Sequence, residues 1–412
     1  MKRTPTLLHL LALAALSACM SQPQQTADTQ STPPAVDTAS IDLSARRVLE
    51  QQEPVLQQQA SVLDVSADLE ELRAASDLPG MACMAVRNGK LVGFGVAGVR
   101  SVETKEKIEI DDPFHIGSCT KAMTSTLAAV LIEQGKLSWG TTIADGLPTL
   151  AKDFHPSYHD VTIELLLRHQ GGIADYGNPE FSGLSGLKRI AAKKGTPVEQ
   201  RREIASIVLK GAPTKPIGMG MEYSNNGYMI AAAIMEKSTN RSWEELIVAE
   251  VFKPMGLESA AIGSPPGKHH PVGHQEKDGK WQALDLGPGG KLPESLSPAG
   301  LVHMNLRDWA TFVTQHIEGH NGSDKGLISS KSFRRLHTDT GHSGYVAGWS
   351  VGEMTWAKGE AWTHDGSDGT WYSLVWAAPK LDLVLLAVSN SGTVPEACHQ
   401  AIGKLREGLK IH

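Results

Sequence analysis

Strand pairs at the two ends of the folded body constrain the architecture of this chain more than any other sequence feature. Met81–Arg87 and Lys90–Gly95 flank Asn88-Gly89, and an Asn-Gly pair supplies the two positive-φ positions of a tight hairpin turn. Near the other end, Trp371–Ala377 and Asp382–Ser389 form a second pair of strand-like segments around a short turn. We therefore expect one antiparallel sheet that both ends of the chain build together.

Helical patterns fill the middle of the chain. Thr120–Gln134 is apolar nearly all round, which predicts a buried helix, and Gly227–Lys237 and Trp243–Phe252 are also helical in pattern. A closing helix carries apolar residues at every fourth position, at Ala397, Ala401, Leu405 and Leu409. The expected fold class is α/β, of the α+β type: an antiparallel sheet flanked by helices, with an inserted, mostly helical domain.

The N-terminal residues form a targeting segment rather than part of the fold. Lys2 and Arg3 precede an apolar stretch, Leu7–Leu16, that is too short to span a bilayer. The following Leu16-Ser17-Ala18-Cys19 resembles a bacterial lipobox, in which the cysteine is lipidated; an ordinary secretory signal cleaved near Ala18 is the alternative. We expect a lipoprotein of the bacterial cell envelope, periplasmic or associated with the outer membrane, that contacts the membrane through acyl chains on Cys19.

These segments divide the chain into four expected parts. Residues 1–18 form a signal peptide, and residues 19–62, rich in Gln, Ser, Thr, Pro and Ala, form a lipidated flexible tether. Residues 63–125 and 290–412 form the α/β domain, and residues 126–289 form the helical insertion.

The composition excludes several kinds of partner and scaffold. The chain has 412 residues with 39 Lys+Arg against 45 Asp+Glu, and its scattered cations predict no nucleic-acid partner. Its 4 cysteines are too few for a disulfide scaffold and show no C-x-x-C spacing. Cys83, Cys119 and Cys398 are expected to be buried packing residues, with a Cys83–Cys398 disulfide as an open alternative.

The segment that opens the buried helix carries the first candidate catalytic pair. Ser118 and Lys121 are three positions apart, so that a helix beginning at Ser118 places both side chains on one face. A serine hydroxyl is a poor nucleophile unless a neighbouring base removes its proton, and a lysine sheltered from water has a lowered pKa that suits this task. Ser-x-x-Lys alone also occurs by chance, with a capping serine and a surface lysine as the structural alternative.

Two further motifs follow in order along the chain. Tyr223-Ser224-Asn225 precedes a helix, and His364-Asp365-Gly366 lies before the second strand pair. The ordered set of Ser-x-x-Lys, Tyr-x-Asn and basic residue-x-Gly resembles the beta-lactamase-related serine hydrolases, which include class C beta-lactamases, D-alanyl-D-alanine carboxypeptidases, D-aminopeptidases and beta-lactamase-like esterases. The resemblance implies a beta-lactamase/penicillin-binding-like fold. Looser supporting stretches lie at residues 78–80, 161–173 and 297–301.

The resemblance also implies a role for each motif residue. Ser118 is the acyl-accepting nucleophile, and Lys121 and Tyr223 share the general-base and general-acid duties. Asn225 orients the substrate and Lys121. The Tyr223 hydroxyl requires nearby cations to ionise, and Lys121 and His364 are expected to supply them.

The oxyanion hole implied by the resemblance consists of the backbone N–H groups of Ser118 and Ser367, the latter next to Gly366 of the third motif. No metal and no cofactor are implied.

The third motif departs from that of the beta-lactamases, which carry Lys-Thr-Gly. A histidine at position 364 resembles the carboxypeptidase and aminopeptidase members, and Asp365 replaces a threonine hydroxyl. If Asp365 faces the cleft, an anionic substrate loses a donor and meets a like charge, but strand alternation leaves the opposite orientation open. Beta-lactam hydrolysis is therefore a weaker expectation.

Other patterns compete with this interpretation. Gly348–Gly352 fits G-x-S-x-G, the nucleophile elbow of α/β-hydrolases, but the alternation that follows it and the Lys358-Gly359 turn favour a strand hairpin. His155 and His159 have the i, i+4 spacing of a metal-binding helix, but no H-E-x-x-H motif accompanies them. A metal site is possible at His269-His270-x-x-x-His274, where solvated loop histidines are the favoured interpretation.

The sequence thus predicts a serine hydrolase that acts through an acyl-enzyme on small esters or on D-amino-acid peptide or amide bonds. Its expected partners are a small-molecule or peptidoglycan-fragment substrate and a membrane. A non-catalytic cell-wall-binding or scaffold protein on the same fold is the alternative, and a beta-lactamase is a weaker one.

Overall fold

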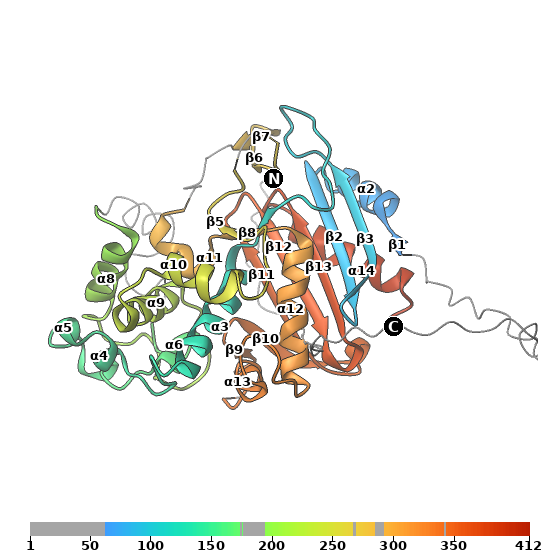
Figure 1. The fold of residues 1–412 in the computed structure, drawn as a ribbon. Helices are drawn as coiled ribbons and strands as arrows, with labels where there is room; N and C mark the ends of the chain where they lie inside the picture. The colour runs from blue at the N-terminus through green and yellow to red at the C-terminus, as the bar shows by residue number, and fades with distance from the viewer. Residues whose placement is uncertain (1–61, 174, 176–193, 267–268, 285–291, 342) are drawn as a thin grey trace, which may run out of the picture.

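A large antiparallel sheet dominates the computed structural model, which describes residues 62–173, 175, 194–266, 269–284, 292–341 and 343–412 (Figure 1). Within these residues the sheet has eight strands in the order β1-β3-β2-β13-β12-β11-β10-β9. The strands are β1 (Leu63–Asp64), β2 (Gly80–Arg87), β3 (Lys90–Gly98), β9 (Tyr345–Val346), β10 (Trp349–Met354), β11 (Gly359–Ser367), β12 (Tyr372–Ala378) and β13 (Leu383–Ser389).

The sheet joins the two ends of the described chain, as the strand pairs predict. Asn88 and Gly89 have φ values of 51° and 68° and turn β2 into β3. On its other edge β2 pairs antiparallel with β13, where Ala85 lies opposite Leu385. Because β13 lies between β2 and β12, the N-terminal and C-terminal hairpins form one continuous surface, and the expected fold class is confirmed.

Helices cover both faces of this sheet (Figure 1). The helix α12 (Leu306–His320) packs on one face, and α2 (Ser66–Ala75) and α14 (Pro395–Gly408) pack on the other. Strand alternation supplies one apolar core to each side: Met84 of β2 belongs to the core beneath α12, whereas Cys83 belongs to the core beneath α14.

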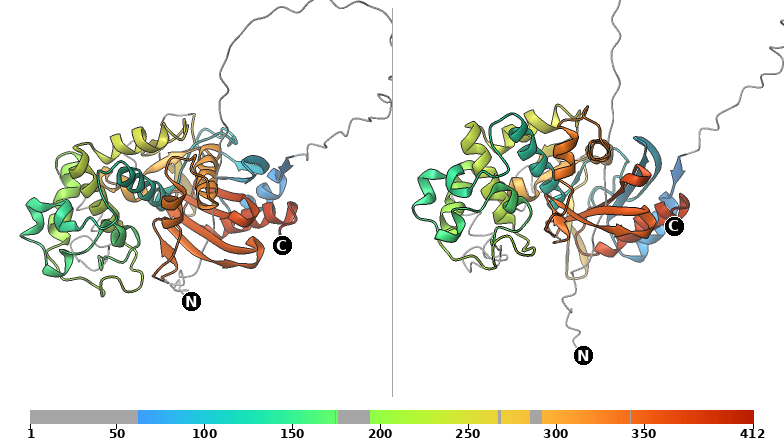
Figure 2. Two further views of the ribbon diagram at one scale, coloured as in Figure 1. Left: turned by 60° about the horizontal axis from the view of Figure 1, so that its bottom comes forward. Right: turned by 90° about the horizontal axis from the view of Figure 1, so that it is seen from below.

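A mostly helical region extends from one side of the sheet, as the views in Figure 2 show. Its elements are α3 (Thr120–Glu133), α4 (Ile143–Gly146), α5 (Pro148–Ala151), η2 (Pro156–Tyr158), α6 (Ile163–Leu167), α8 (Pro197–Val208), α9 (Asn225–Thr239), α10 (Trp243–Ile247) and η3 (Val248–Phe252). The expected helix Trp243–Phe252 is thus divided, because its second half adopts a π-helix. The helix α3 is the buried helix that the sequence predicts, with Thr120 to Leu131 all buried.

Short elements complete the fold. They are η1 (Gly117–Cys119), η4 (Glu294–Leu296), α11 (Ser297–Gly300), α13 (Ser330–Arg335), η5 (Thr355–Ala357), η6 (Pro379–Leu381), the small sheet of β4 (Phe114–His115), β8 (Val302–Met304) and β5 (Ala261–Ile262), and the hairpin of β6 (Gly273–Lys277) and β7 (Lys280–Leu284). The G-x-S-x-G pattern lies largely in β10, which forms an antiparallel pair with β11, so the strand interpretation is correct and no nucleophile elbow exists there.

The targeting segment lies outside the described residues. This applies to the expected signal peptide at residues 1–18, to Cys19 and to the expected tether except for Val62. Among the residues that the structure describes, no helix is both long and apolar enough to cross a membrane.

Candidate active site

Ser118 lies where the buried helix begins, at the junction of the sheet and the helical region. It belongs to the 3₁₀ turn η1, which leads directly into α3 and packs against β11 and β12 of the sheet. The neighbouring Gly117 and Cys119 are buried, whereas Ser118 remains partly exposed. A substrate can therefore reach the Ser118 hydroxyl, while the backbone around it is fixed by packing.

Lys121 occupies the first turn of α3 and is completely buried. Its Nζ lies 3.2 Å from Ser118 Oγ, 2.7 Å from Asn225 Oδ1 and 2.7 Å from the Ala299 carbonyl oxygen. Burial lowers the pKa of Lys121 from 10.5 to about 7, and the coulombic effect of Asp175 opposes this shift.

The contacts of Lys121 accommodate both the ammonium, which donates to Ser118, Asn225 and Ala299, and the neutral amine. A neutral amine has two N–H donors and one lone pair, whereas an ammonium has three donors. The two short contacts to Asn225 and Ala299 take both donors of the neutral form. The lone pair then remains for the Ser118 hydroxyl proton, which is the arrangement that a general base requires.

Tyr223 stands on the other side of the nucleophile. The Lys121 Nζ lies 4.6 Å from the centre of the Tyr223 ring, and the phenol hydrogen-bonds the Ser118 side chain. Burial raises the pKa of Tyr223 well above 10, and the hydrogen bond to Ser118 only partly offsets this effect. The phenol is therefore neutral near pH 7 and is suited to donate a proton rather than to act as a phenolate.

His364 does not supply the cation that the sequence predicts. Burial lowers its pKa to about 4. Its Nδ1 lies 2.5 Å from the Asp365 carbonyl oxygen, and because a carbonyl oxygen only accepts, Nδ1 carries the proton. In the neutral ring Nε2 is then the acceptor, and the Tyr345 hydroxyl donates to it at 3.1 Å. His364 is thus a neutral imidazole whose two nitrogens are both engaged, and the expectation of a second cation beside Tyr223 is wrong.

The third motif brings β11 into direct contact with the start of α3. A Cβ atom on Gly366 would lie 2.1 Å from the Ile116 oxygen and 2.7 Å from the Ser118 nitrogen. A Cβ atom on Gly117 would lie 2.6 Å from the Ser367 nitrogen. Only residues without a side chain permit this approach, which places the two backbone nitrogens of the expected oxyanion hole at one junction.

The side chain of Ser367 stabilises the turn that follows β11. Its Oγ donates to the Trp371 oxygen at 2.7 Å and accepts from the Gly369 nitrogen at 2.9 Å. These bonds hold the turn after β11, so the contribution of Ser367 to the junction with Ser118 is its backbone.

Asp365 points away from the nucleophile, which resolves the alternative that the sequence leaves open. It is exposed, whereas His364 and Gly366 on either side are buried. Its carboxylate acts on Tyr372 and His399 on the side of the sheet that α14 covers, and its charge also raises the pKa of Lys121 and Tyr223. A substrate in front of Ser118 does not meet this carboxylate directly.

Several residues of the site escape the sequence motifs. Asp175 accepts hydrogen bonds from Asn225 Nδ2 at 2.5 Å and from the Asn226 nitrogen at 2.9 Å. This contact fixes the Asn225 amide so that its oxygen faces Lys121. No motif identifies Asp175, and its position two residues after the 161–173 stretch is the nearest signal.

Two aromatic rings, those of His169 and Tyr345, lie against Tyr223. The His169 ring lies 4.4 Å from that of Tyr223 and 4.6 Å from that of Tyr345, and its Nδ1 accepts from the Ser224 nitrogen. His169 and Ala299 lie in stretches that support the family resemblance, so the sequence offered a signal for both. Tyr345 follows no recognisable pattern.

The histidine groups do not form a metal site among the described residues, where no set of three or more His, Cys, Asp or Glu side chains could hold a metal ion. His155 accepts from the Ser157 nitrogen and His159 contacts the Ala151 oxygen. The interpretation of His274 as a solvated loop residue is wrong: it is completely buried at the start of β6, with Nδ1 3.0 Å from the Asn390 oxygen.

The cysteines of the folded body are buried free thiols. Cys119 Sγ lies 3.5 Å from the His364 oxygen, on the side of the turn that faces β11. Burial raises the pKa of Cys83, Cys119 and Cys398, which agrees with their expected role as packing residues.

Comparisons with known proteins give one consistent family. The family model described as "Beta-lactamase" matches residues 65–406. The chain is 25% identical over 332 residues to "Penicillin-binding protein 4" of Amycolatopsis lactamdurans, covering 78% of this chain and 83% of the relative.

Solved structures agree on the fold. An octameric penicillin-binding protein homologue from Pyrococcus abyssi superposes with a TM-score of 0.66 at 21% identity, covering 83% of this chain and 77% of that one. The D-amino acid amidase of Ochrobactrum anthropi SV3 superposes with a TM-score of 0.63 at 18% identity, covering 83% and 96% of the two chains.

Proposed function

This chain belongs to the Beta-lactamase family, and from that premise we propose that it hydrolyses small esters and D-amino-acid amide bonds through an acyl-enzyme on Ser118. The observation that carries the proposal is the state of Lys121. A buried amine with a pKa of about 7, 3.2 Å from a partly exposed serine hydroxyl, is a general base poised at neutral pH.

Acylation follows from the contacts around Ser118. As Ser118 Oγ bonds to the carbonyl carbon, its proton moves to the Lys121 amine, and the electron pair of the C=O bond moves to the oxygen. The N–H groups of Ser118 and Ser367 receive that oxyanion. When the carbonyl re-forms, the C–O or C–N bond breaks, and the leaving alcohol or amine takes a proton from Tyr223.

Deacylation uses the same groups in a second round. The Lys121 ammonium returns its proton to Tyr223, which restores the neutral amine. Water then donates a proton to Lys121 and attacks the acyl carbon, and collapse of the second tetrahedral intermediate breaks the bond to Ser118 Oγ. The carboxylic acid leaves, and the Lys121 ammonium returns a proton to Ser118 Oγ.

The charge of the site supports uncharged leaving groups. Where beta-lactamases of the family carry a lysine, this chain has His364, whose pKa of about 4 leaves it neutral near pH 7. A substrate with a free carboxylate beyond the scissile bond therefore has no fixed cation at the third motif. Amides and esters without that carboxylate do not need such a cation, so their binding is not weakened by its absence. The solved structure named a D-amino acid amidase shares this fold.

The test is an activity screen beside Ser118→Ala. We expect turnover of p-nitrophenyl acetate and D-alaninamide, slower turnover of D-alanyl-D-alanine peptides and least of nitrocefin. A fluorophosphonate probe should add to wild-type protein at the tryptic peptide that contains Ser118 and should not add to Ser118→Ala. A folded wild-type protein that neither turns over these substrates nor takes the label would refute the proposal and favour a non-catalytic binding protein.

We also propose that the chain is exported and held at the membrane through lipid on Cys19, on the basis of the lipobox-like Leu16-Ser17-Ala18-Cys19. Membrane fractions of cells that produce the wild-type chain should contain the protein, and Cys19→Ser should move it to the soluble fraction. Equal partition of the two forms would count against lipidation.

A further inference from the structure

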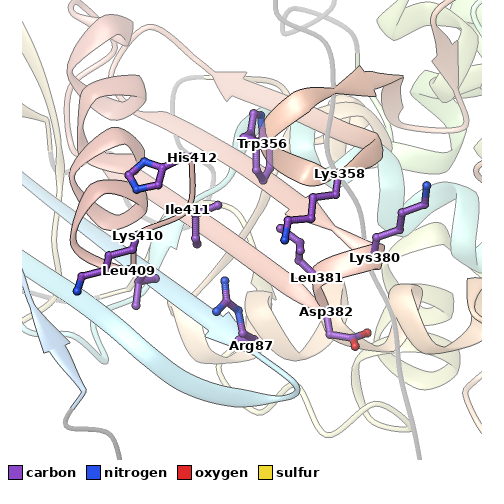
Figure 3. A pocket seen from close by; sticks show the side chains of 10 residues that line it. All are labelled: Arg87, Trp356, Lys358, Lys380, Leu381, Asp382, Leu409, Lys410, Ile411 and His412. Carbon is purple, nitrogen blue, oxygen red and sulfur yellow. The ribbon is translucent and has the colours of Figure 1, made fainter.

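A pocket away from Ser118 lies where β11 begins (Figure 3). It has a volume of about 370 Å³, which is within the range of small-molecule sites. The residues that line it are Arg87, Trp356, Lys358, Lys380, Leu381, Asp382, Leu409, Lys410, Ile411 and His412. The strand β11 begins at Gly359 beside this pocket and ends at Ser367, so about 26 Å of extended chain separates the two sites.

The pocket concentrates positive charge on a chain whose formal net charge is −6. Arg87, Lys358, Lys380 and Lys410 line it, and Asp382 is the acidic side chain among the ten lining residues. None of these four cations takes part in the ion pairs found among the described residues. Four cations gathered around one acidic lining side chain favour an anionic ligand.

Two guanidinium groups at this pocket carry unsatisfied donors. The Nε atoms of Arg87 and Arg406 are buried and have no hydrogen-bond partner. Arg406 lies directly behind the pocket wall, with its guanidinium carbon 4.9 Å from the centre of the Trp356 ring and a contact to the Ile411 oxygen. A buried donor without a partner is costly, and an acceptor bound beside Arg87, which lines the pocket, relieves that cost for its Nε.

The side chains are arranged around a partly apolar floor. Figure 3 shows Arg87 and Lys358 directed towards the middle of the pocket from different sides, with Lys380 and Lys410 directed outward along its rim. Leu381, Leu409 and Ile411 supply the apolar surface. This combination suits a ligand with two parts: a phosphate group that hydrogen-bonds to Arg87 and Lys358, and a partly apolar group that contacts the floor.

We propose that this pocket binds a phosphate-bearing ligand, either the headgroup of an anionic phospholipid or a soluble phosphate ester. The place where the chain enters the folded body supports the first source. Leu63 packs against the last turn of α14, because a Cβ on Gly408 would lie 2.5 Å from Leu63 Cδ2. The expected membrane tether therefore joins the body beside the residues that form the pocket.

Calorimetric titration of the full chain with three soluble probes tests the proposal: inorganic phosphate, glycerol 3-phosphate and dihexanoyl phosphatidylglycerol below its micellar concentration. We expect saturable binding that weakens at rising salt. The double variant Arg87→Gln/Lys358→Gln should bind at least about tenfold more weakly, since each charge-assisted hydrogen bond contributes about a factor of ten or more.

The controls separate the pocket from the rest of the surface. Lys358 is exposed, so Lys358→Gln alone keeps the test valid if the double variant fails to fold. Lys136→Gln/Lys152→Gln removes two exposed lysines from the helical region and should leave binding unchanged. Hydrolysis of p-nitrophenyl acetate should be the same in all these variants, because Ser118 lies at the far end of β11.

The outcomes show whether the pocket binds phosphate and which of the two ligand classes it binds. Tighter binding of dihexanoyl phosphatidylglycerol than of glycerol 3-phosphate assigns the pocket to a lipid headgroup, and equal binding of the two assigns it to a soluble phosphate ester. Absence of saturable binding for all three probes, or equal weakening in the pocket and control variants, would overturn the proposal.

Discussion

The close approach of β11 to Ser118 gives the sharpest test of the site, through Gly366→Ala. The added Cβ would lie 2.1 Å from the Ile116 oxygen, 2.7 Å from the Ser118 nitrogen and 2.8 Å from Ser373 Oγ. Ordinary contact begins at 3.4 Å, so the strand must retreat from the Ile116 oxygen by about 1.3 Å. The change is steric alone, because the backbone of Gly366 does not have a positive φ.

The movement required is large on the scale of a hydrogen bond. An N–H···O bond of about 2.9 Å that lengthens by about 1.3 Å is lost, and loss of one oxyanion donor lowers kcat by about 100- to 1,000-fold. The strand cannot yield freely, because Ser373 Oγ donates to the Ile116 oxygen at 2.7 Å and Cys119 Sγ contacts the His364 oxygen. Overpacking should also lower the free energy of unfolding by about 1–3 kcal/mol.

The assay combines kcat for p-nitrophenyl acetate with thermal unfolding of the same samples. The matched control is Gly403→Ala in α14, where a Cβ meets no atom within 4 Å; it should retain full activity and unchanged or slightly higher stability. A folded Gly366→Ala protein with wild-type kcat would refute the assignment of the oxyanion hole to the Ser118–Ser367 junction.

Four further predictions follow from charged and titratable groups. Because the pKa of Lys121 is lowered to about 7, kcat/KM should fall about tenfold per pH unit below pH 7, and a rate that stays flat down to pH 5 would contradict the lysine base. Asp175 raises the pKa of Lys121, so Asp175→Asn should move this acid limb to lower pH; an unmoved limb would mean that Asp175 has only a structural role. The pKa of His316 is lowered by burial to about 3, below its unfolded value of 6.5, so stability is lost as pH falls from 6.5 towards 3, by about 1.4 kcal/mol per pH unit; urea unfolding of wild type and His316→Phe measures the difference in slope. Arg201→Met should cost about 3–5 kcal/mol of unfolding free energy, since it leaves the buried Glu236 carboxylate and the partly buried Glu244 carboxylate without their cation. The exposed Arg202→Met should cost less than about 0.5 kcal/mol.

Local chemistry explains why the architecture was predictable. The Asn88-Gly89 turn requires two positive φ angles that few other dipeptides adopt, so these two adjacent residues are enough to predict the first hairpin. The all-round apolar pattern of α3 likewise permits only a buried helix. In both cases the deciding interactions lie within one turn or one helix.

The features that the sequence did not predict depend on contacts between distant segments. The neutrality of His364 results from burial and from Tyr345, which neither its motif nor the residues around it disclose. Asp175 acts on Asn225 from 50 residues away in sequence. His274 is buried because it meets Asn390, although its sequence neighbours have the composition of a loop. Charge states and second partners of this kind require the folded arrangement.

The order of strands in the sheet has a consequence for synthesis. The strand β2 emerges from the ribosome early, but its central neighbour β13 is the last strand among the described residues. The N-terminal hairpin therefore stays without that neighbour until Leu383–Ser389 has been synthesised. A nascent chain of this topology therefore cannot complete its central sheet before the whole helical region has been synthesised.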